Sequence, residues 1–257
     1  MRMLFILILI VNFSNAHAQE NNLVADYTYT IKHEILPSAT TVNSRLTANA
    51  FESHYEMDFV GNLNFIEEEA GVDGGSALAV KVKQNPIIYK DNQSKYIYSI
   101  ERIFLKPFLV KDSMNIFNWK INENKKEILG YSCQQATVHY RGRNYTAYFT
   151  TEIPFQTGPW KFYGLPGLIL EAESDDGVLK LNINKIAINT TTTTTTDIVN
   201  PYLDIKLQPI SWDEYIIEYE KKHEEFKGFR DPNGGTISIP KRIIETLISD
   251  KYLSENP

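Results

Sequence analysis

Two arginines stand at the predicted tip of a hairpin, where their side chains could bind an anion. Arg141 and Arg143 flank Gly142, and a guanidinium group is a planar donor that can pair with two oxygens of a carboxylate or a phosphate. The alternative, which we favour because arginines on loop tips are commonly solvated, is that neither holds a ligand. Both residues are therefore kept as candidate binding residues.

Cys133 is the only cysteine in the 257 residues, so it has no disulfide partner within the chain. It could act as a nucleophile with His139 as its base. However, a strand that carries both residues among apolar neighbours more often buries the thiol, and no cationic residue adjoins Cys133 in sequence to lower its pKa. We expect a thiol in the core, with a reactive thiol as the alternative.

Acidic residues near a second predicted hairpin could bind calcium through their carboxylate oxygens. They are Glu171, Glu173, Asp175 and Asp176. Strand alternation and the frequency of aspartate in turns favour an ordinary turn instead. The common signatures of metal, nucleotide and hydrolase sites are absent from the sequence, and the histidines after the predicted signal peptide are far apart (His33, His54, His139 and His223). No metal ion or other cofactor is expected.

Most of the chain has the pattern of β-strands, which must position these candidates. Apolar and polar residues alternate in 27–31 and 96–100, and such alternation is typical of strands with one buried face. A hairpin is predicted over 137–149 with its turn at 141–144, and a second over 168–184 with its turn at Asp175-Asp176-Gly177. The sequence predicts a mainly β fold, a large curved antiparallel sheet of half-barrel type.

Two helices are predicted in the C-terminal tail. Ser211 and Glu214 form a capping-box pattern before an apolar stripe. This stripe contains Trp212, Tyr215, Ile216, Tyr219 and Phe226, the pairs Glu218 with Lys222 and Lys221 with Glu225 lie beside it, and Gly228 follows. A second short helix is predicted to start near Pro240 and to present Ile243, Ile244, Leu247 and Ile248. We expect both helices to pack on the sheet, with binding of a partner as the alternative.

The predicted organisation has four parts. Residues 1–18 form a signal peptide, because Arg2 precedes an apolar run and Ala16-His17-Ala18 fits a signal peptidase site. Residues 19–189 form the β domain. Residues 190–201 contain a threonine run and form a linker or surface loop, with an edge strand as the alternative, and residues 202–257 form the helical tail.

Composition and charge restrict the cellular location and the kinds of binding partner that we expect. The apolar run near the N-terminus is too short to cross a membrane, so we expect a periplasmic or secreted protein with no transmembrane segment after removal of the signal peptide. The net charge of -6 and the pI of about 5.5 argue against nucleic acid as a partner.

The hexapeptide from Gly164 to Ile169 has the pattern of a tight turn before a strand. In Leu165-Pro166-Gly167-Leu168, proline fixes φ at the second position and glycine accepts a positive φ at the third, which is typical of a type II turn. The alternative is a ligand-lining loop with Trp160 and Phe162 beside it. A valine at Gly167 is predicted to cost about 1 to 3 kcal/mol, and more than a valine at Gly142.

Several motifs occur in a fixed order from Trp119 to Glu173. They are Gly130-Tyr131-Ser132-Cys133-Gln134-Gln135-Ala136, Arg141-Gly142-Arg143, Glu152-Ile153-Pro154, Gly158-Pro159-Trp160-Lys161-Phe162 and Gly164-Leu165-Pro166-Gly167-Leu168-Ile169. This series resembles the GLPGLI family of exported proteins of Gram-negative bacteria, except for Tyr148 where a tryptophan is common. The resemblance implies export and implies no particular activity. Asp112-Ser113-Met114 is similar to an acceptor for O-linked sugars in some of these bacteria, so Ser113 is a candidate glycosylation site.

Three classes of function remain open. The favoured one is a non-catalytic envelope protein that binds a peptide, an apolar ligand such as a lipid, or a partner protein, because aromatic residues are plentiful and catalytic signatures are absent. The candidate binding residues are Arg141, Arg143, Trp160, Phe162, Gly164, Leu165, Pro166 and Gly167. The alternatives are an envelope hydrolase or peptide-modifying enzyme that uses Cys133 or the carboxylates, and a structural or assembly subunit.

Overall fold

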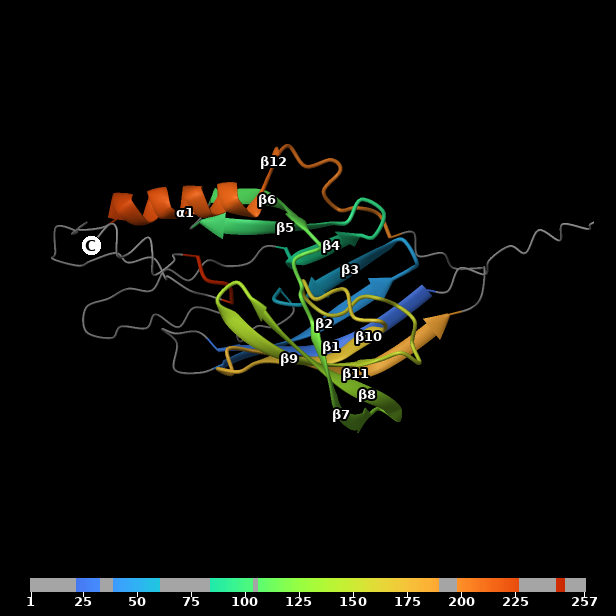
Figure 1. The fold of residues 1–257 in the computed structure, drawn as a ribbon. Coiled ribbons are helices and arrows are strands. Elements are labelled where there is room, and N and C mark those ends of the chain that lie inside the picture. The colour runs from blue at the N-terminus through green and yellow to red at the C-terminus, as the bar shows by residue number, and fades with distance from the viewer. Residues whose placement is uncertain are drawn as a thin grey trace, which may run out of the picture.

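The computed structural model describes residues 22–32, 39–60, 84–103, 106–189, 198–226 and 244–247. Within these residues the fold is mainly β, with twelve strands and one helix (Figure 1). The elements are β1 (Asn22–Lys32), β2 (Ala39–Ala48), β3 (Glu52–Met57), β4 (Ile87–Asp91), β5 (Tyr96–Ile103), β6 (Lys106–Ser113), β7 (Lys120–Ile128), β8 (Tyr131–Tyr140), β9 (Arg143–Thr150), β10 (Leu168–Ser174), β11 (Leu179–Asn189), β12 (Pro209–Ile210) and α1 (Trp212–Phe226). The predicted signal peptide and the threonine run lie outside the described residues.

All twelve strands belong to one sheet, in the order β12-β6-β5-β4-β3-β2-β1-β11-β10-β9-β8-β7. Two antiparallel meanders, one from β1 to β6 and one from β7 to β11, are joined where β1 pairs with β11. The predicted sheet was wholly antiparallel, and this is wrong at one edge, because β12 runs parallel to β6. The sheet is therefore mixed but mostly antiparallel, and it is not closed.

The predicted alternation is confirmed in the central strand. In β1, buried and half-buried residues alternate from Ala25 to Ile31, as expected for a strand with one face on the core. The edge strand β7 has five charged residues and is exposed over most of its length. Charged side chains on an edge strand discourage pairing with other chains.

The two ends of this strand order lie close together in space. Ten strand spacings separate β6 from β7, and at about 4.8 Å each these would span roughly 48 Å in a flat sheet. The connection from Ser113 to Lys120 can bridge no more than about 25 Å when fully extended. Asp112 of β6 also forms an ion pair with Arg141, which directly follows β8. Residues from distant strands can thus meet in one site.

The inner face of the sheet is covered by the connection between β9 and β10, residues 151–167, which we call the inner loop. Its side chains Ile153, Trp160, Phe162 and Leu165 are at most 3% exposed and belong to the same core cluster as the inward residues of the strands. Lys90 of β4 fastens this loop, because its Nζ donates to the carbonyl oxygens of Gly158 and Phe162 at 2.6 and 3.0 Å. The main core thus lies between the sheet and the inner loop.

Helix α1 begins as predicted. The Ser211 hydroxyl accepts a hydrogen bond from the Glu214 N–H, and the Glu214 carboxylate accepts one from the Ser211 N–H, which completes the capping box. Tyr215 and Tyr219 are buried against Ile103 and Val110 of β5 and β6. In the described part of the chain, no helix is long and apolar enough to span a membrane.

Two details of the predicted tail are wrong. The ion pairs on α1 are Glu218 with Lys221 and Lys222 with Glu225, three residues apart rather than four, and the helix surface allows both spacings. The second helix is not formed at residues 244–247, which are bends and extended backbone, so α1 is the only helix in the described part of the tail. The Thr246 N–H donates to the Arg141 carbonyl oxygen at 2.9 Å, because tertiary contacts override helix propensity here.

The hexapeptide forms a turn of another type than predicted. The Gly167 N–H donates to the Leu165 carbonyl oxygen at 2.8 Å, while the Leu168 N–H donates to the carbonyl oxygen of Ile153 in the inner loop at 3.1 Å. This is a three-residue γ-turn centred on Pro166, whose ring favours the required φ. Gly167 has a φ of +154°, and a Cβ there would lie 1.9 Å from the Thr150 carbonyl oxygen. Glycine is needed because one backbone passes directly against another.

Candidate functional site

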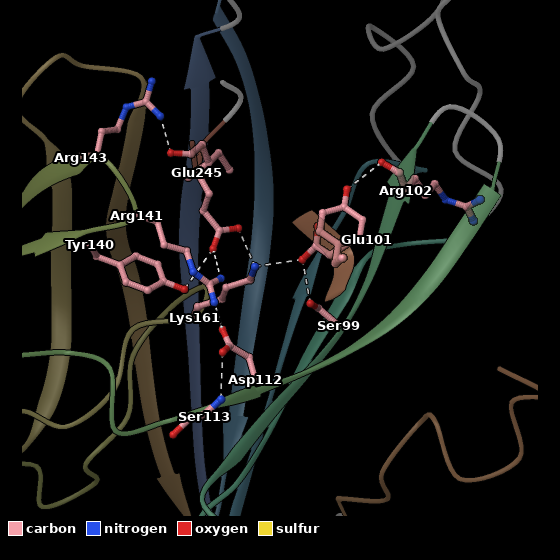
Figure 2. Close-up of polar contacts among 12 residues, drawn as sticks. Ser99, Glu101, Arg102, Asp112, Ser113, Tyr140, Arg141, Arg143, Lys161 and Glu245 are labelled. Atoms are coloured by element: carbon pink, nitrogen blue, oxygen red, sulfur yellow. Dashed lines mark hydrogen bonds and ion pairs between the residues drawn. The ribbon is translucent and has the colours of Figure 1, made fainter. Parts of the chain in front are cut away.

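A buried carboxylate lies at the centre of a cluster of charged side chains. Glu245 is 6% exposed, and its two oxygens contact Arg141 Nη1 at 2.5 Å and Lys161 Nζ at 2.6 Å. The Tyr140 hydroxyl donates to the same carboxylate at 3.0 Å. Figure 2 shows Glu245 between these groups. We call Tyr140, Arg141 and Lys161 the carboxylate pocket.

The tip of the β8–β9 hairpin aims Arg141 into this pocket. Arg141 and Gly142 both have positive φ, +45° and +80°, as in the two-residue turns that match the twist of a hairpin. The predicted turn covered residues 141–144. In the structure Arg143 and Asn144 belong to β9 instead. The expectation that the arginines are solvated is wrong, because the Arg141 and Arg143 side chains are 13% and 4% exposed.

Lys161 reaches the pocket from the inner loop and is almost wholly buried. Its Nζ also contacts Glu101 Oε1 of β5 at 2.9 Å, and that oxygen accepts a hydrogen bond from Ser99 at 2.7 Å. Arg141 has a second partner too, since its Nη2 lies 2.5 Å from Asp112 Oδ2 of β6. Two cations and three carboxylates thus alternate in space, which limits the repulsion among them.

An aromatic side chain covers the two cations. The Trp212 ring centroid lies 3.5 Å from Arg141 Cζ and 4.9 Å from Lys161 Nζ, within the range of cation–π attraction. Trp212 is the first residue of α1, so the helix contributes to the pocket as well as to the core. Water is largely excluded from these charges, which strengthens each interaction and raises the cost of leaving one unpaired.

The pocket controls the protonation of Glu245. Burial alone would raise the pKa of this carboxyl, but the ion pairs with Lys161 and Arg141 hold the pKa below its ordinary value. For Lys161, burial opposes the charge, and Glu101 and Glu245 raise its pKa above the usual value. For Asp112, burial outweighs the attraction of Arg141 and raises the pKa. Glu245 and Lys161 are therefore both charged at neutral pH.

A dependence of stability on pH follows from these directions. Because the folded pKa of Glu245 is depressed, its contribution is present above its unfolded pKa of about 4.5 and is lost as the pH falls through the folded pKa. The contribution of Lys161 is present below about 10.5. We expect the difference in unfolding free energy between the wild type and Glu245→Gln to be constant between these values and to shrink below pH 4.5. Urea unfolding at pH 3.5 to 9 checks this, and a difference that grows on acidification would contradict it.

The backbone around Glu245 is held as firmly as its side chain. The Ile244 carbonyl oxygen accepts hydrogen bonds from Arg143 Nη1 and from the Tyr145 hydroxyl. Leu247 is 5% exposed and packs with Tyr215 and Tyr219 of α1. Residues 244–247, which we call the C-terminal segment, are thus bound at each position by the hairpin, the inner loop or α1.

The structure brings together only some of the predicted site residues. Arg141 and Arg143 meet at the C-terminal segment, and Arg143 Nε also contacts Asp176 of the β10–β11 turn at 2.7 Å. Trp160 and Phe162 are buried and stack edge to face, and Leu165 is 1% exposed. Trp160, Phe162 and Leu165 therefore fill the core, while Gly164, Pro166 and Gly167 shape the turn that leads into β10.

The remaining acidic and modification candidates have local roles. Glu173 pairs with Lys180 across the hairpin at 3.3 Å, and Glu171 contacts Lys126. No group of three metal-binding side chains is found among the described residues. Ser113 is half-buried between Asp112, which is paired with Arg141, and Met114, which is 2% exposed. A modifying enzyme would therefore meet a motif whose two flanking side chains are engaged in the fold.

Cys133 is fully buried, and its unreactive form is favoured. Burial, followed by the nearby Glu171 carboxylate, raises the pKa of its thiol to about 11. A thiolate is the reactive species, so a rise of two units lowers its population roughly a hundredfold. We expect a thiol probe at pH 8 to react at least about a hundredfold more slowly with the folded protein than with the urea-unfolded chain. Similar rates in the two states would contradict this.

Of this cluster, the sequence named only Arg141 as a candidate binding residue, and it missed Tyr140 and all members outside the hairpin. Glu245 is a single charge within an apolar stretch from Ile243 to Ile248, and Lys161 is a single charge between Trp160 and Phe162. A charge in such surroundings is a signal for a buried ion pair. Glu101, Asp112 and Trp212 gave no such signal, because each lies in an ordinary amphipathic pattern.

A stretch that contains part of this site matches a family model. Residues 139–171 match a family model described as "Protein of unknown function (Porph_ging)". This stretch contains Tyr140, Arg141, Arg143 and Lys161, while Glu245 lies outside it. No curated protein matches the chain.

Several solved structures show a distant similarity. PNGF-II in a P21 crystal form has 12% identity and a TM-score of 0.49 over 79% of this chain and 34% of that one. In a C2 form the values are 12% and 0.47 over 77% and 32%. The chain therefore spans about a third of the length of PNGF-II. A putative outer membrane lipoprotein-sorting protein domain from Vibrio parahaemolyticus has 9% identity and a TM-score of 0.25 over 68% of this chain and 88% of that one.

Proposed function

We propose that this chain is an exported, non-catalytic binding protein that holds a carboxylate-bearing polypeptide in the pocket of Tyr140, Arg141 and Lys161. The observation that carries the proposal is the burial of one carboxylate, on a residue only 6% exposed, between two cations and a hydroxyl. Such a pocket is selective, because a ligand without a carboxylate would remove one of the two ion pairs that Arg141 and Lys161 each make, and would leave them with Asp112 and Glu101 alone. In this chain the carboxylate of Glu245 occupies the pocket.

The distribution of buried side chains favours a polypeptide over a lipid as ligand. In the half-barrel form that we propose for the sheet, an apolar ligand would occupy the inner face. The inner loop covers that face with Trp160, Phe162 and Leu165, and ring contacts link Trp160 and Phe162 to Tyr145. The carboxylate pocket, in contrast, already accommodates a polypeptide segment with both side-chain and backbone contacts.

The competing functions have less support. A hydrolase that uses Cys133 would need a thiolate, and burial raises the pKa of this thiol. A structural or assembly role would use the same ion pairs only to fasten the C-terminal segment to the sheet. The two roles differ in whether the pocket accepts a carboxylate that is not part of the chain.

The test is rescue of an emptied pocket. In the full chain with Glu245→Ala, we expect acetate or propionate to raise the thermal unfolding midpoint saturably above the effect of chloride at the same ionic strength. The matched control Glu173→Ala lacks an exposed carboxylate that pairs with Lys180, and should show no difference between the anions. Equal effects of carboxylates and chloride on Glu245→Ala would overturn the proposal.

Export is part of the proposal and has its own test. The apolar run after Arg2 and the Ala16-His17-Ala18 site support cleavage before Gln19. We expect the protein isolated from its native host to begin at Gln19, in the periplasm or the medium. N-terminal sequencing that finds an intact Met1 would rule this out.

A further inference from the structure

The C-terminal segment lies on a surface formed by the tip of the β8–β9 hairpin, Lys161 of the inner loop and α1, which we call the groove, as a peptide lies on a receptor. It has extended backbone and bends rather than helix, and each of its four residues makes a contact with the rest of the protein. The Ile244 carbonyl oxygen binds Arg143, the Glu245 carboxylate binds Arg141 and Lys161, the Thr246 N–H binds the Arg141 carbonyl oxygen, and Leu247 packs on α1. This arrangement combines backbone pairing with side-chain pockets, as in other forms of peptide recognition.

The contacts define which residues a ligand would need at each position. The pocket requires a carboxylate at the distance of a glutamate side chain, because both Arg141 and Lys161 must be reached. At the next position the side chain must be small, since Thr246 Oγ1 lies only 2.0 Å from where a Cβ on Gly142 would stand. The Thr246 hydroxyl has no hydrogen-bond partner among the described residues, so its polarity is not recognised.

We propose that the groove exchanges its own C-terminal segment for an extended peptide of a second polypeptide with the pattern aliphatic residue, glutamate, small residue, leucine. This inference rests on the carboxylate-binding function proposed above. Opening the groove without a replacement would break one of the two ion pairs that each buried cation makes. Arg141 would keep Asp112 as a partner and Lys161 would keep Glu101, in a site with little water. A peptide that supplies the same carboxylate removes this penalty, so exchange is favoured over simple opening.

The tethered segment then acts as a built-in competitor. An intramolecular ligand has a high effective concentration, and an incoming peptide must compete with it in the wild type. When the chain's own segment lacks the carboxylate, that segment binds the pocket more weakly and competes less well with an external peptide. The affinity for an external peptide should therefore rise when Glu245 is removed.

The experiment measures binding of a fluorescent peptide of residues 241–249 to the full chain by anisotropy. We expect saturable binding to Glu245→Ala that is at least tenfold tighter than binding to the wild type. The same peptide with glutamine at the position of Glu245 should bind at least tenfold more weakly. If Glu245→Ala does not fold, as judged by circular dichroism, Leu247→Ala weakens the tethered segment while it keeps the carboxylate, and the same order of peptides is expected.

A paired change of size locates the peptide in the groove. Gly142→Ala in the Glu245→Ala chain brings a Cβ against the position of Thr246, so it should weaken the original peptide and favour a peptide with glycine at that position. Equal binding of the glutamate and glutamine peptides, or no binding, would overturn the inference. If acetate still stabilises Glu245→Ala in that case, the proposed function survives, and if it does not, both fail.

Discussion

Glu245→Ala is expected to lower the free energy of unfolding by about 3 to 5 kcal/mol, the range for removing one partner of a buried ion pair. The carboxylate is 6% exposed and has three donors. Its removal leaves Arg141 and Lys161 charged in a site that Trp212 covers. Such a loss is a large part of the total stability of a typical domain. Urea unfolding at pH 7 with a two-state analysis measures it.

Two comparisons separate this effect from a general loss of charge. Glu173→Ala removes an exposed carboxylate paired with Lys180, and should change the unfolding free energy by no more than about 0.5 kcal/mol. Adding Lys161→Met to Glu245→Ala removes a cation whose remaining carboxylate partner is Glu101. The double variant should recover part of the loss, because a buried apolar side chain replaces a cation that has lost one of its two partners, and Glu101 is 26% exposed and can be solvated. A loss below about 1 kcal/mol for Glu245→Ala would show that water reaches the pocket.

Local patterns in the sequence predicted the elements that depend on near neighbours. The alternation in β1 and the capping box of α1 were confirmed because each rests on residues two to four positions apart. The same holds for the tight turn at Asp175-Asp176-Gly177 between β10 and β11, where Gly177 has a φ of +70°. Periodicity and turn chemistry are local properties, so one sequence is enough to read them.

The errors occur where distant residues decide the structure. The arginines at the hairpin tip were expected in solvent, but Arg141 has the partners Asp112 and Glu245, which lie 29 and 104 positions away. The apolar spacing near Ile244 suited a helix, yet the Thr246 N–H pairs with the hairpin. No local pattern contains such information. An isolated charge in an apolar stretch, as at Glu245 and Lys161, was the only available signal.

The predicted effect of glycine substitution changes for the same reason. A valine at Gly142 was expected to cost less than one at Gly167, because a loop tip can relax. Instead it packs against Thr246 of the C-terminal segment, so a side chain at Gly142 should displace that segment before it disturbs the sheet. The loss of unfolding free energy for a substitution at Gly142 then cannot exceed what the contacts of residues 244–247 contribute to stability. At Gly167 the neighbour is the backbone of β9, which cannot move aside without loss of strand pairing.

Gly167→Ala is accordingly expected to be the most destabilising glycine substitution, with a loss of about 3 kcal/mol or more in the free energy of unfolding. A Cβ there would stand 1.9 Å from the Thr150 carbonyl oxygen and 2.7 Å from its carbon, both backbone atoms of β9. Relief would require β9 to move away from the start of β10, which breaks the pairing of Leu168 with Thr150.

The matched control for this substitution is Gly177→Ala. Gly177 also has a positive φ, +70°, but a Cβ there would meet no atom within 4 Å. It should cost only the conformational penalty of a left-handed alanine, about 1 kcal/mol. Urea unfolding of Gly167→Ala, Gly142→Ala and Gly177→Ala should give losses in that descending order. If Gly167→Ala costs no more than Gly177→Ala, the positive φ alone explains why residue 167 is a glycine. The close approach of β9 would then not be the reason for it.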